Sequence, residues 1–250
     1  MLTGLIHKIG KKIPHIRRTR CFCLGAAKTG TTSFAAMFAA CYRSAHEPQP
    51  EKLTVAIEKV ITGIWRDGEV AAWLEARDRE LNLEVEASHP LGYVARWLPE
   101  LFPQARFVIT LRDPLPWLKS RLNFHYHKSP PEWLRYRDLI WSRWHKGYNP
   151  EELVLEEMGL YSIDAYLAQY AEQYQLLFRD LPEERTLLLR TDELSESIDR
   201  IASFLGIDPR TITRQHQNAF TAEDSVIDFL PEDFVARRVD HHCGWLREYL

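Results

Sequence analysis

A short segment near the amino end combines the residue types that bind phosphate groups. An apolar run at 21–24 precedes it and a helix-forming run at 34–40 follows it, so the segment joins a buried strand to a helix. Glycines let such a loop approach an anion closely, and the free amides at the helix start favour negative charge. We therefore expect a phosphate-binding loop whose contributing residues are Lys28, Thr29, Gly30, Thr31, Thr32 and Ser33.

This loop differs from the Walker A motif of nucleotide triphosphatases. Gly25 and Gly30 have the right separation, but Thr31 follows Gly30 where that motif has a lysine. Lys28 instead lies two residues before Gly30, so the metal and γ-phosphate arrangement of those enzymes is not evident. An ordinary turn between a strand and a helix is the alternative interpretation.

Lys-Thr-Gly-Thr-Thr-Ser directly after a strand resembles the 5′-phosphosulfate loop of the sulfotransferases. The resemblance implies 3′-phosphoadenosine 5′-phosphosulfate (PAPS) as the sulfuryl donor and 3′-phosphoadenosine 5′-phosphate (PAP) as the product. It also implies a catalytic role for Lys28, which would hold the charge that grows on the leaving phosphate.

A second candidate phosphate anchor follows another apolar run. Arg112 directly follows the run at 106–111, and Ser120 lies eight residues later, within the next expected helix. An arginine at a strand end can clamp a phosphate through two hydrogen bonds, and a serine about two helical turns on adds a neutral donor. The arrangement resembles the 3′-phosphate site of sulfotransferases, although a turn with a surface ion pair would have the same sequence.

The later part of the chain resembles the family less closely. The segment 186–206 is similar to the family's late strand and the helix after it, with Thr191 in place of the aromatic residue that meets the adenine. Arg237 and Arg238 are the nearest match to the Arg-Lys-Gly segment that closes over the 3′-phosphate, but the glycine is missing. A solvated helix end is the alternative for these two arginines, and the resemblance covers about residues 21–206.

Three side chains near one strand end are candidates for the catalytic base. Glu86 matches the base of the glycosaminoglycan-type branch, a glutamate two residues before a serine, and we rank it first. His89 is the candidate by resemblance to the cytosolic branch, and Glu84 ranks third. Each could instead be a surface charge or a capping group. His46 and Glu47 follow the first helix and could border the acceptor site, although loop residues of this kind are usually solvated.

Apolar runs that alternate with helical patterns predict a single α/β domain. We expect a central parallel sheet of about four to five strands flanked by helices, with ligands at the carboxyl ends of the strands. The expected strands cover 21–24, 81–87, 106–111 and 186–190. The expected helices cover 34–40, most of 51–80, 93–101, 114–122, 163–181 and 195–205, with a loop at 43–50 and an irregular aromatic region at 125–150.

Charge is distributed unevenly along the 250 residues. Residues 1–20 hold six basic residues and no acid, whereas the net charge of the whole chain is −3. We expect a basic extension at 1–20, either solvated or in weak contact with a membrane surface, and a domain at 21–250. Within that domain, 125–160 and 207–250 are expected to be variable acceptor-side or lid segments. The overall balance does not suggest a nucleic-acid partner.

Cysteine usage suggests neither disulfides nor a metal site. Cys21 and Cys23 lie on one face of an expected strand and are more typical of core packing than of metal ligands, so we expect no metal. A reduced, cytoplasmic setting fits best.

These features predict a PAPS-dependent sulfotransferase that works by metal-free, in-line displacement. The acceptor would be a hydroxyl or amine of an unidentified small molecule, carbohydrate or lipid-like compound. The alternatives are a P-loop kinase acting on a small molecule and a non-catalytic nucleotide-binding scaffold. The sequence leaves the oligomeric state open.

Overall fold

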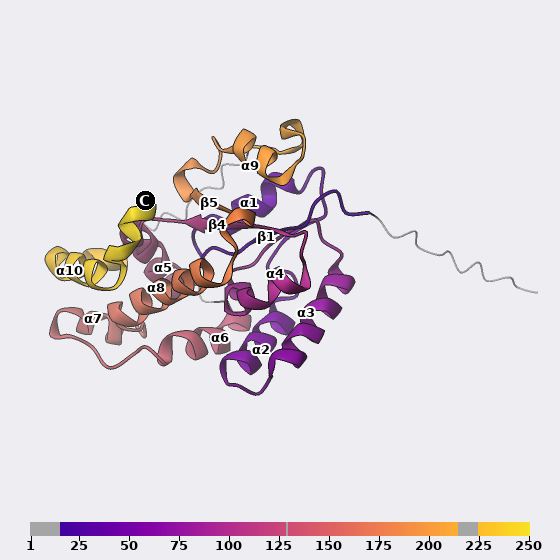
Figure 1. Cartoon of the computed structure of the whole chain (residues 1–250). Coiled ribbons are helices and arrows are strands. Elements are labelled where there is room, and N and C mark those ends of the chain that lie inside the picture. Colours follow the sequence, from indigo (N-terminus) through magenta and orange to yellow (C-terminus); the bar gives the residue numbers. More distant parts are fainter. Residues whose placement is uncertain (1–15, 129, 215–224) are drawn as a thin grey trace, which may run out of the picture.

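Five short parallel strands form the centre of the molecule in a computed structural model that describes residues 16–128, 130–214 and 225–250 (Figure 1). The strands are β1 (Cys21–Cys23), β2 (Ser44–His46), β3 (Val85–Ala87), β4 (Arg106–Leu111) and β5 (Thr186–Arg190). Their order in the sheet is β2-β3-β1-β4-β5, and every neighbouring pair is parallel. The predicted parallel α/β fold is confirmed, and all carboxyl ends lie at one edge of the sheet.

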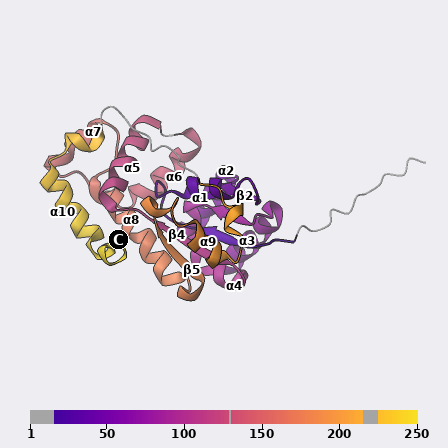
Figure 2. The same ribbon diagram turned by 90° about the horizontal axis from the view of Figure 1, so that it is seen from above.

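Helices cover both faces of this sheet. In Figure 1, α1 and α9 lie on one side, and α2, α3, α4, α6 and α8 lie on the other. Figure 2 shows α7 and α10 at the end of the molecule opposite to α3. The helices are α1 (Thr31–Phe38), α2 (Pro50–Ile61), α3 (Asp67–Leu81), α4 (Leu98–Leu101), α5 (Pro114–Lys128), α6 (Pro131–Ser142), α7 (Leu153–Glu157), α8 (Ile163–Asp180), α9 (Ile198–Leu205) and α10 (Glu232–Cys243).

The alternation of side chains along the strands divides the core into two layers. Cys21 and Cys23 of β1 are buried on the side of α1 and α9, as expected for core residues. Phe22 points to the other face, where its ring centroid lies 5.6 Å from that of Phe102 and 6.1 Å from that of Phe107. Each fully buried side chain of this size contributes about 1.5–3 kcal/mol to the stability of the sheet that carries the site.

Two predictions around β2 and β3 were wrong. The region expected as a loop at 43–50 contains β2, which is too short to show an alternating pattern. The strand expected at 81–87 is reduced to β3, because Leu81 is the last residue of α3 and Asn82 caps that helix in a left-handed conformation. The backbone amides of Glu84 and Val85 then donate to the carbonyl of Arg43, which brings the two strands together.

Three other elements differ from expectation in detail. The aromatic region expected to be irregular contains α6, and the short helix expected at 93–101 is a 3₁₀ helix at His89–Trp97 followed by α4. Helix α9 begins at Ile198 rather than at Ser195. Its end is as predicted, with Gly206 at a φ of 67°, the left-handed conformation that glycine adopts without strain.

The described part of the basic extension is bound to the domain through ion pairs. Arg17 and Arg20 both contact the carboxylate of Asp78, and Arg18 pairs with Glu84. The expected membrane contact falls mainly on residues 1–15, which lie outside the described residues. Among the helices that the structure describes, none is long and apolar enough to cross a bilayer.

Candidate functional site

Two glycines shape the loop between β1 and α1. A Cβ atom at Gly25 would lie 2.0 Å from the hydroxyl oxygen of Thr110 on the neighbouring strand β4, so only glycine fits there. Gly30 precedes α1 with a φ of 96°, and a Cβ atom there would lie 2.5 Å from a methyl carbon of Leu194. The loop is therefore pressed against β4 and against the segment after β5.

The carbonyl groups of this loop are held by other parts of the protein. Trp117 donates from its indole nitrogen to the carbonyl of Ala27 at 2.8 Å. Thr191 donates from its hydroxyl to the carbonyl of Thr29 at 2.7 Å. No side chain caps the start of α1, so the first amides of that helix keep their capacity to bind an anion.

The expected hydroxyl donors of the loop have different surroundings. Thr29 is fully buried and its hydroxyl bonds to Thr110 at 2.8 Å, so it supports the loop from beneath. The hydroxyls of Thr31 and Thr32 lie 3.1 and 3.2 Å from Nε2 of His46. Ser33 is half-buried in the same first turn of α1.

Lys28 is the cation of the loop. Its backbone has a φ of 72°, and its ammonium group lies 4.7 Å from the ring centroid of Phe124. Burial lowers the pKa of Lys28, and the nearby charges of Arg121 and Arg112 lower that pKa further. No ion pair of Lys28 is found among the described residues, although the carboxylate of Glu47 raises the pKa of Lys28 in part.

Arg112 lies beside a cavity of about 290 Å³ between the ends of β4 and β5. Its guanidinium donates to the carbonyl of Lys28 at 3.3 Å, which connects this cavity to the loop. Thr191 also lines the cavity, although its hydroxyl is engaged with the carbonyls of Thr29 and Leu111. Ser120 is half-buried on α5 and does not line this cavity.

The two arginines expected to close over the 3′-phosphate lie elsewhere. Arg238 of α10 forms an ion pair with Asp164 of α8 at 2.5 Å, and His242 contacts the same carboxylate. Arg237 is exposed on α10. Helix α10 packs against α8, and Arg238 therefore has a partner within the protein.

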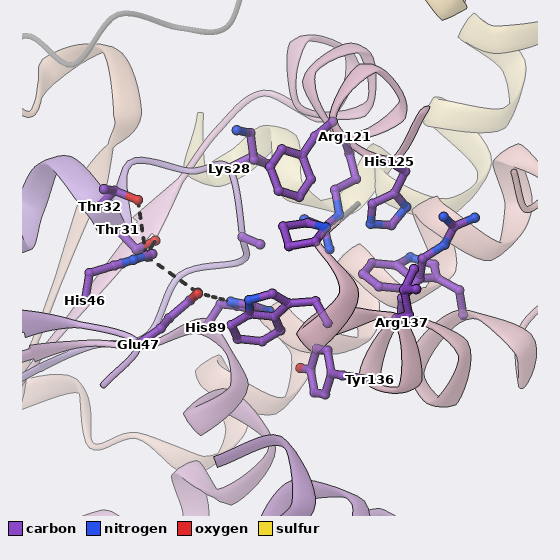
Figure 3. Close-up of a pocket in the computed structure, with 16 residues that line it drawn as sticks. Lys28, Thr31, Thr32, His46, Glu47, His89, Arg121, His125, Tyr136 and Arg137 are labelled. Atoms are coloured by element: carbon purple, nitrogen blue, oxygen red, sulfur yellow. Dashed lines mark hydrogen bonds and ion pairs between the residues drawn. The ribbon is translucent and has the colours of Figure 1, made fainter. Parts of the chain in front are cut away.

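A second cavity, of about 160 Å³, lies on the other side of Lys28 (Figure 3). One wall comes from the loop and from the segments after β2 and β3, and the other comes from α5 and α6. The polar lining residues are Lys28, Thr31, Thr32, His46, Glu47, His89, Arg121, His125 and Arg137. The apolar and aromatic ones are Ala27, Phe124, Pro130, Trp133, Leu134, Tyr136 and Trp141.

Glu47 and His89 form a hydrogen-bonded pair in the wall of this cavity. Nδ1 of His89 donates to a carboxylate oxygen of Glu47, whose side chain is only 15% exposed. Burial raises the pKa of Glu47, but the nearby His89 outweighs it and the net pKa is lowered. Nε2 of His89 is buried and has no hydrogen-bond partner among the described residues. A carboxylate that holds Nδ1–H leaves Nε2 as a proton acceptor.

His46 connects this pair to the loop. Its Nε2 lies 3.5 Å from the carboxylate of Glu47 and within hydrogen-bonding distance of Thr31 and Thr32. Burial lowers the pKa of His46, which favours the neutral form of the imidazole. Of the two alternatives for His46 and Glu47, a solvated loop and a place beside the site, the structure has the second, because β2 ends at His46 and both residues line this cavity.

Glu86 and Glu84 are both engaged in ion pairs. Glu86 is buried, and both of its carboxylate oxygens accept from the guanidinium of Arg77 at 2.6 Å, while Ser88 donates to one of them at 2.8 Å. Glu84 lies just before the first residue of β3, and its carboxylate accepts hydrogen bonds from the guanidinium of Arg18. Neither glutamate lines the cavity, whereas His89 does.

Sequence reasoning missed the most telling features of this site. The pairing of Glu47 with His89 joins residues 42 positions apart, and no local pattern indicates it. Arg121 was also not predicted as a site residue. The one sequence signal for it is its position directly after Ser120, which was a candidate. Within the described ranges, no group of three His, Cys, Asp or Glu side chains could hold a metal ion.

Comparisons with known proteins agree with this architecture. A family model described as a sulfotransferase domain matches residues 20–218, which is most of the chain. A sulfotransferase from Alicyclobacillus acidocaldarius has a similar fold, with a TM-score of 0.52 and 16% identity over 92% of this chain and 96% of that chain. A search of curated proteins finds no match.

Two further solved structures are more distant. The sulfotransferase domain from the curacin biosynthetic pathway has a TM-score of 0.45 and 10% identity, over 82% of this chain and 80% of that chain. The sulfotransferase domain from the Synechococcus PCC 7002 olefin synthase has a TM-score of 0.42 and 13% identity, over 87% of this chain and 82% of that chain.

Proposed function

The chain belongs to the sulfotransferase domain family, and from this premise we propose that it transfers a sulfuryl group from PAPS to an acceptor hydroxyl or amine. The observation that carries the proposal is the pair of Glu47 and His89, which shares one cavity with Lys28 of the phosphate-binding loop. A base and a cation for the leaving group are the two elements that in-line sulfuryl transfer requires.

The surroundings of the loop support PAPS as the donor. The loop amides, Lys28 and the start of α1 suit the 5′-phosphosulfate, and Arg112 suits the 3′-phosphate. Lys28 and Arg112 form no ion pair within the described part of the chain, while burial lowers the pKa of each. Half-buried cations without ion-pair partners fit a ligand that carries several negative charges.

In the proposed step, the acceptor oxygen or nitrogen forms a bond to sulfur while the bond from sulfur to the phosphate oxygen of PAPS breaks. Nε2 of His89 accepts the acceptor's proton, and Glu47 stabilises the resulting imidazolium. PAP leaves with the additional negative charge on its 5′-phosphate, which Lys28 and the loop amides stabilise.

Calorimetry with PAP in the presence of a chelator tests the donor, with ATP–Mg²⁺ and NADPH as comparison ligands. We expect PAP to bind without metal and to compete with PAPS. Labelled PAPS and a panel of sugars, phenols, aliphatic alcohols and amines then test transfer. Binding that prefers ATP–Mg²⁺ would indicate a kinase, and PAP binding without transfer to any acceptor would favour the scaffold.

A further inference from the structure

Arg121 is a buried cation that has no partner within the described part of the protein. The residue lies on α5, is 6% exposed and lines the cavity that holds His89. It forms no hydrogen bond or ion pair with any described residue, and its Nε is buried and unbonded. Its contacts are with aromatic faces, at 4.6 Å from the ring centroid of Trp141 and 5.8 Å from that of Phe124.

Such a side chain is costly for the folded protein. Burial lowers the pKa of Arg121 to about 10, which still leaves it charged at neutral pH. A buried charge without a partner is strongly unfavourable, and proteins ordinarily pair it with an acid. Arg77, the comparable buried arginine on α3, has such a partner in Glu86. The missing partner of Arg121 is therefore expected to come from a ligand.

The shape and charge of the cavity indicate where this ligand lies. Figure 3 shows Arg121 reaching from its helix toward the middle of the cavity, between Lys28 and His125. Arg137 of α6 adds a second guanidinium to the lining, and Glu47 is the one carboxylate among the described lining residues. Glu47 is hydrogen-bonded to His89, so its attraction for Arg121 acts through space, without a direct ion pair.

We propose that the acceptor carries a carboxylate that binds Arg121, an apolar body that packs on the aromatic walls, and a hydroxyl that faces His89. This inference rests on the proposed function and assigns its substrate class, a hydroxy acid with an apolar or aromatic body. A planar guanidinium holds a carboxylate through two parallel hydrogen bonds. Trp133 and Tyr136, which pack against His89 at 5.5 and 5.6 Å between ring centroids, provide the apolar surface.

Binding of matched acids and amides tests the proposal without requiring turnover. The probes are para-hydroxyphenylacetate and ω-hydroxyhexanoate, each compared with its neutral amide, with and without PAP. We expect at least one acid to bind about 10- to 100-fold more tightly than its amide, as is typical for a hydrogen bond to a charged group. Arg121→Met should remove this preference, and Arg121→Lys should retain part of it.

Three controls distinguish a specific role of Arg121 from general effects of charge, of stability and of donor binding. Lys119→Met removes a charge from an exposed position on the same helix, and it should leave the preference for the acid intact. Thermal unfolding of Arg121→Met should show a midpoint equal to or above that of the wild type, because an unpaired buried charge is gone. PAP and PAPS affinities are measured for the same variants.

Three results would overturn the proposal. The first is an acid that binds no better than its amide in both pairs, including a failure of both acids to bind. The second is a preference for the acid that survives in Arg121→Met. The third is that Arg121→Met loses affinity for PAPS but not for PAP, which would assign Arg121 to the donor's sulfonate. Failure of PAP to bind at all would instead contradict the proposed function, while the acid and amide comparison would still stand.

Discussion

The imidazole of His89 is hydrogen-bonded through Nδ1 to the carboxylate of Glu47, although the two residues follow different strands of the sheet. Glu47 follows β2 and His89 follows β3, and the backbone amide of Glu47 donates to the carbonyl of Ala87 at the end of β3. The register of these two parallel strands thus brings the acid and the base together beside Lys28.

His89→Ala should reduce sulfuryl transfer by about 10²–10⁴-fold, because the proton acceptor is lost. Glu47→Gln should also reduce the rate, since the amide does not stabilise the imidazolium. PAP affinity should stay near the wild-type value in both variants. His241→Ala, at an exposed position on α10, is the control. If His89→Ala transfers normally while a folded Glu86→Gln variant is inactive, the base is Glu86.

Arg112→Ala should weaken PAP binding more than the binding of adenosine 5′-phosphosulfate, which lacks the 3′-phosphate. The loss of a charge-assisted hydrogen bond should cost about 1.5–3 kcal/mol of binding free energy. Calorimetry with both ligands measures the difference. Arg210→Ala removes an exposed arginine paired with Asp208 and should affect neither ligand. Equal losses for both ligands in Arg112→Ala would place this residue away from the 3′-phosphate.

Glu86→Ala should destabilise the fold, because it leaves the guanidinium of Arg77 buried without its carboxylate. Removal of one partner from a buried pair typically costs about 3–5 kcal/mol. Urea unfolding measures this change. The control is Glu75→Ala, which breaks the exposed pair with Arg79 on the same helix and should cost less than about 1 kcal/mol. A stability loss no larger than that of the control would show that the pair with Arg77 does not hold α3 to β3.

Glu84 should contribute to stability in a pH-dependent way. Burial raises its pKa, but hydrogen bonds from Arg18 and Arg43 outweigh this and lower the pKa from 4.5 to about 2. The depressed pKa means that the contribution is fully present above pH 4.5 and is lost as the pH falls toward 2. The stability difference between wild type and Glu84→Gln should therefore shrink over this range. A difference that is independent of pH between neutrality and pH 2 would contradict the ion pair.

Gly25→Ala should disrupt the loop between β1 and α1, because its Cβ would overlap the hydroxyl and carbonyl oxygens of Thr110. We expect lower stability and weaker PAP binding. Gly68→Ala is the matched control, since a Cβ there meets no atom within 4 Å and the residue lies in α3. It should be neutral or stabilise the protein by up to about 1 kcal/mol. Wild-type PAP affinity in Gly25→Ala would show that the loop is not held against β4 in this way.

Local sequence patterns were sufficient to predict the fold class and the position of the loop between β1 and α1. Continuous apolar runs such as 106–111 are typical of buried parallel strands, and the glycines, the lysine and the hydroxyls of the loop are neighbours along the chain. Because the carboxyl ends of parallel strands share one edge of the sheet, Lys28 and Arg112 were expected near one another. The hydrogen bond from Arg112 to the carbonyl of Lys28 confirms that the two residues are close together.

Contacts between segments distant in the chain decide which side chains form ion pairs and which line the cavities. Glu86 and Arg121 are both buried polar residues. Helix α3 supplies an arginine to Glu86, whereas no described carboxylate forms an ion pair with Arg121. Arg238 is likewise assigned by the packing of α10 on α8, which places Asp164 beside it. Such pairings depend on the register of short strands and on contacts between helices that are distant in the chain. Local sequence patterns do not indicate either of these.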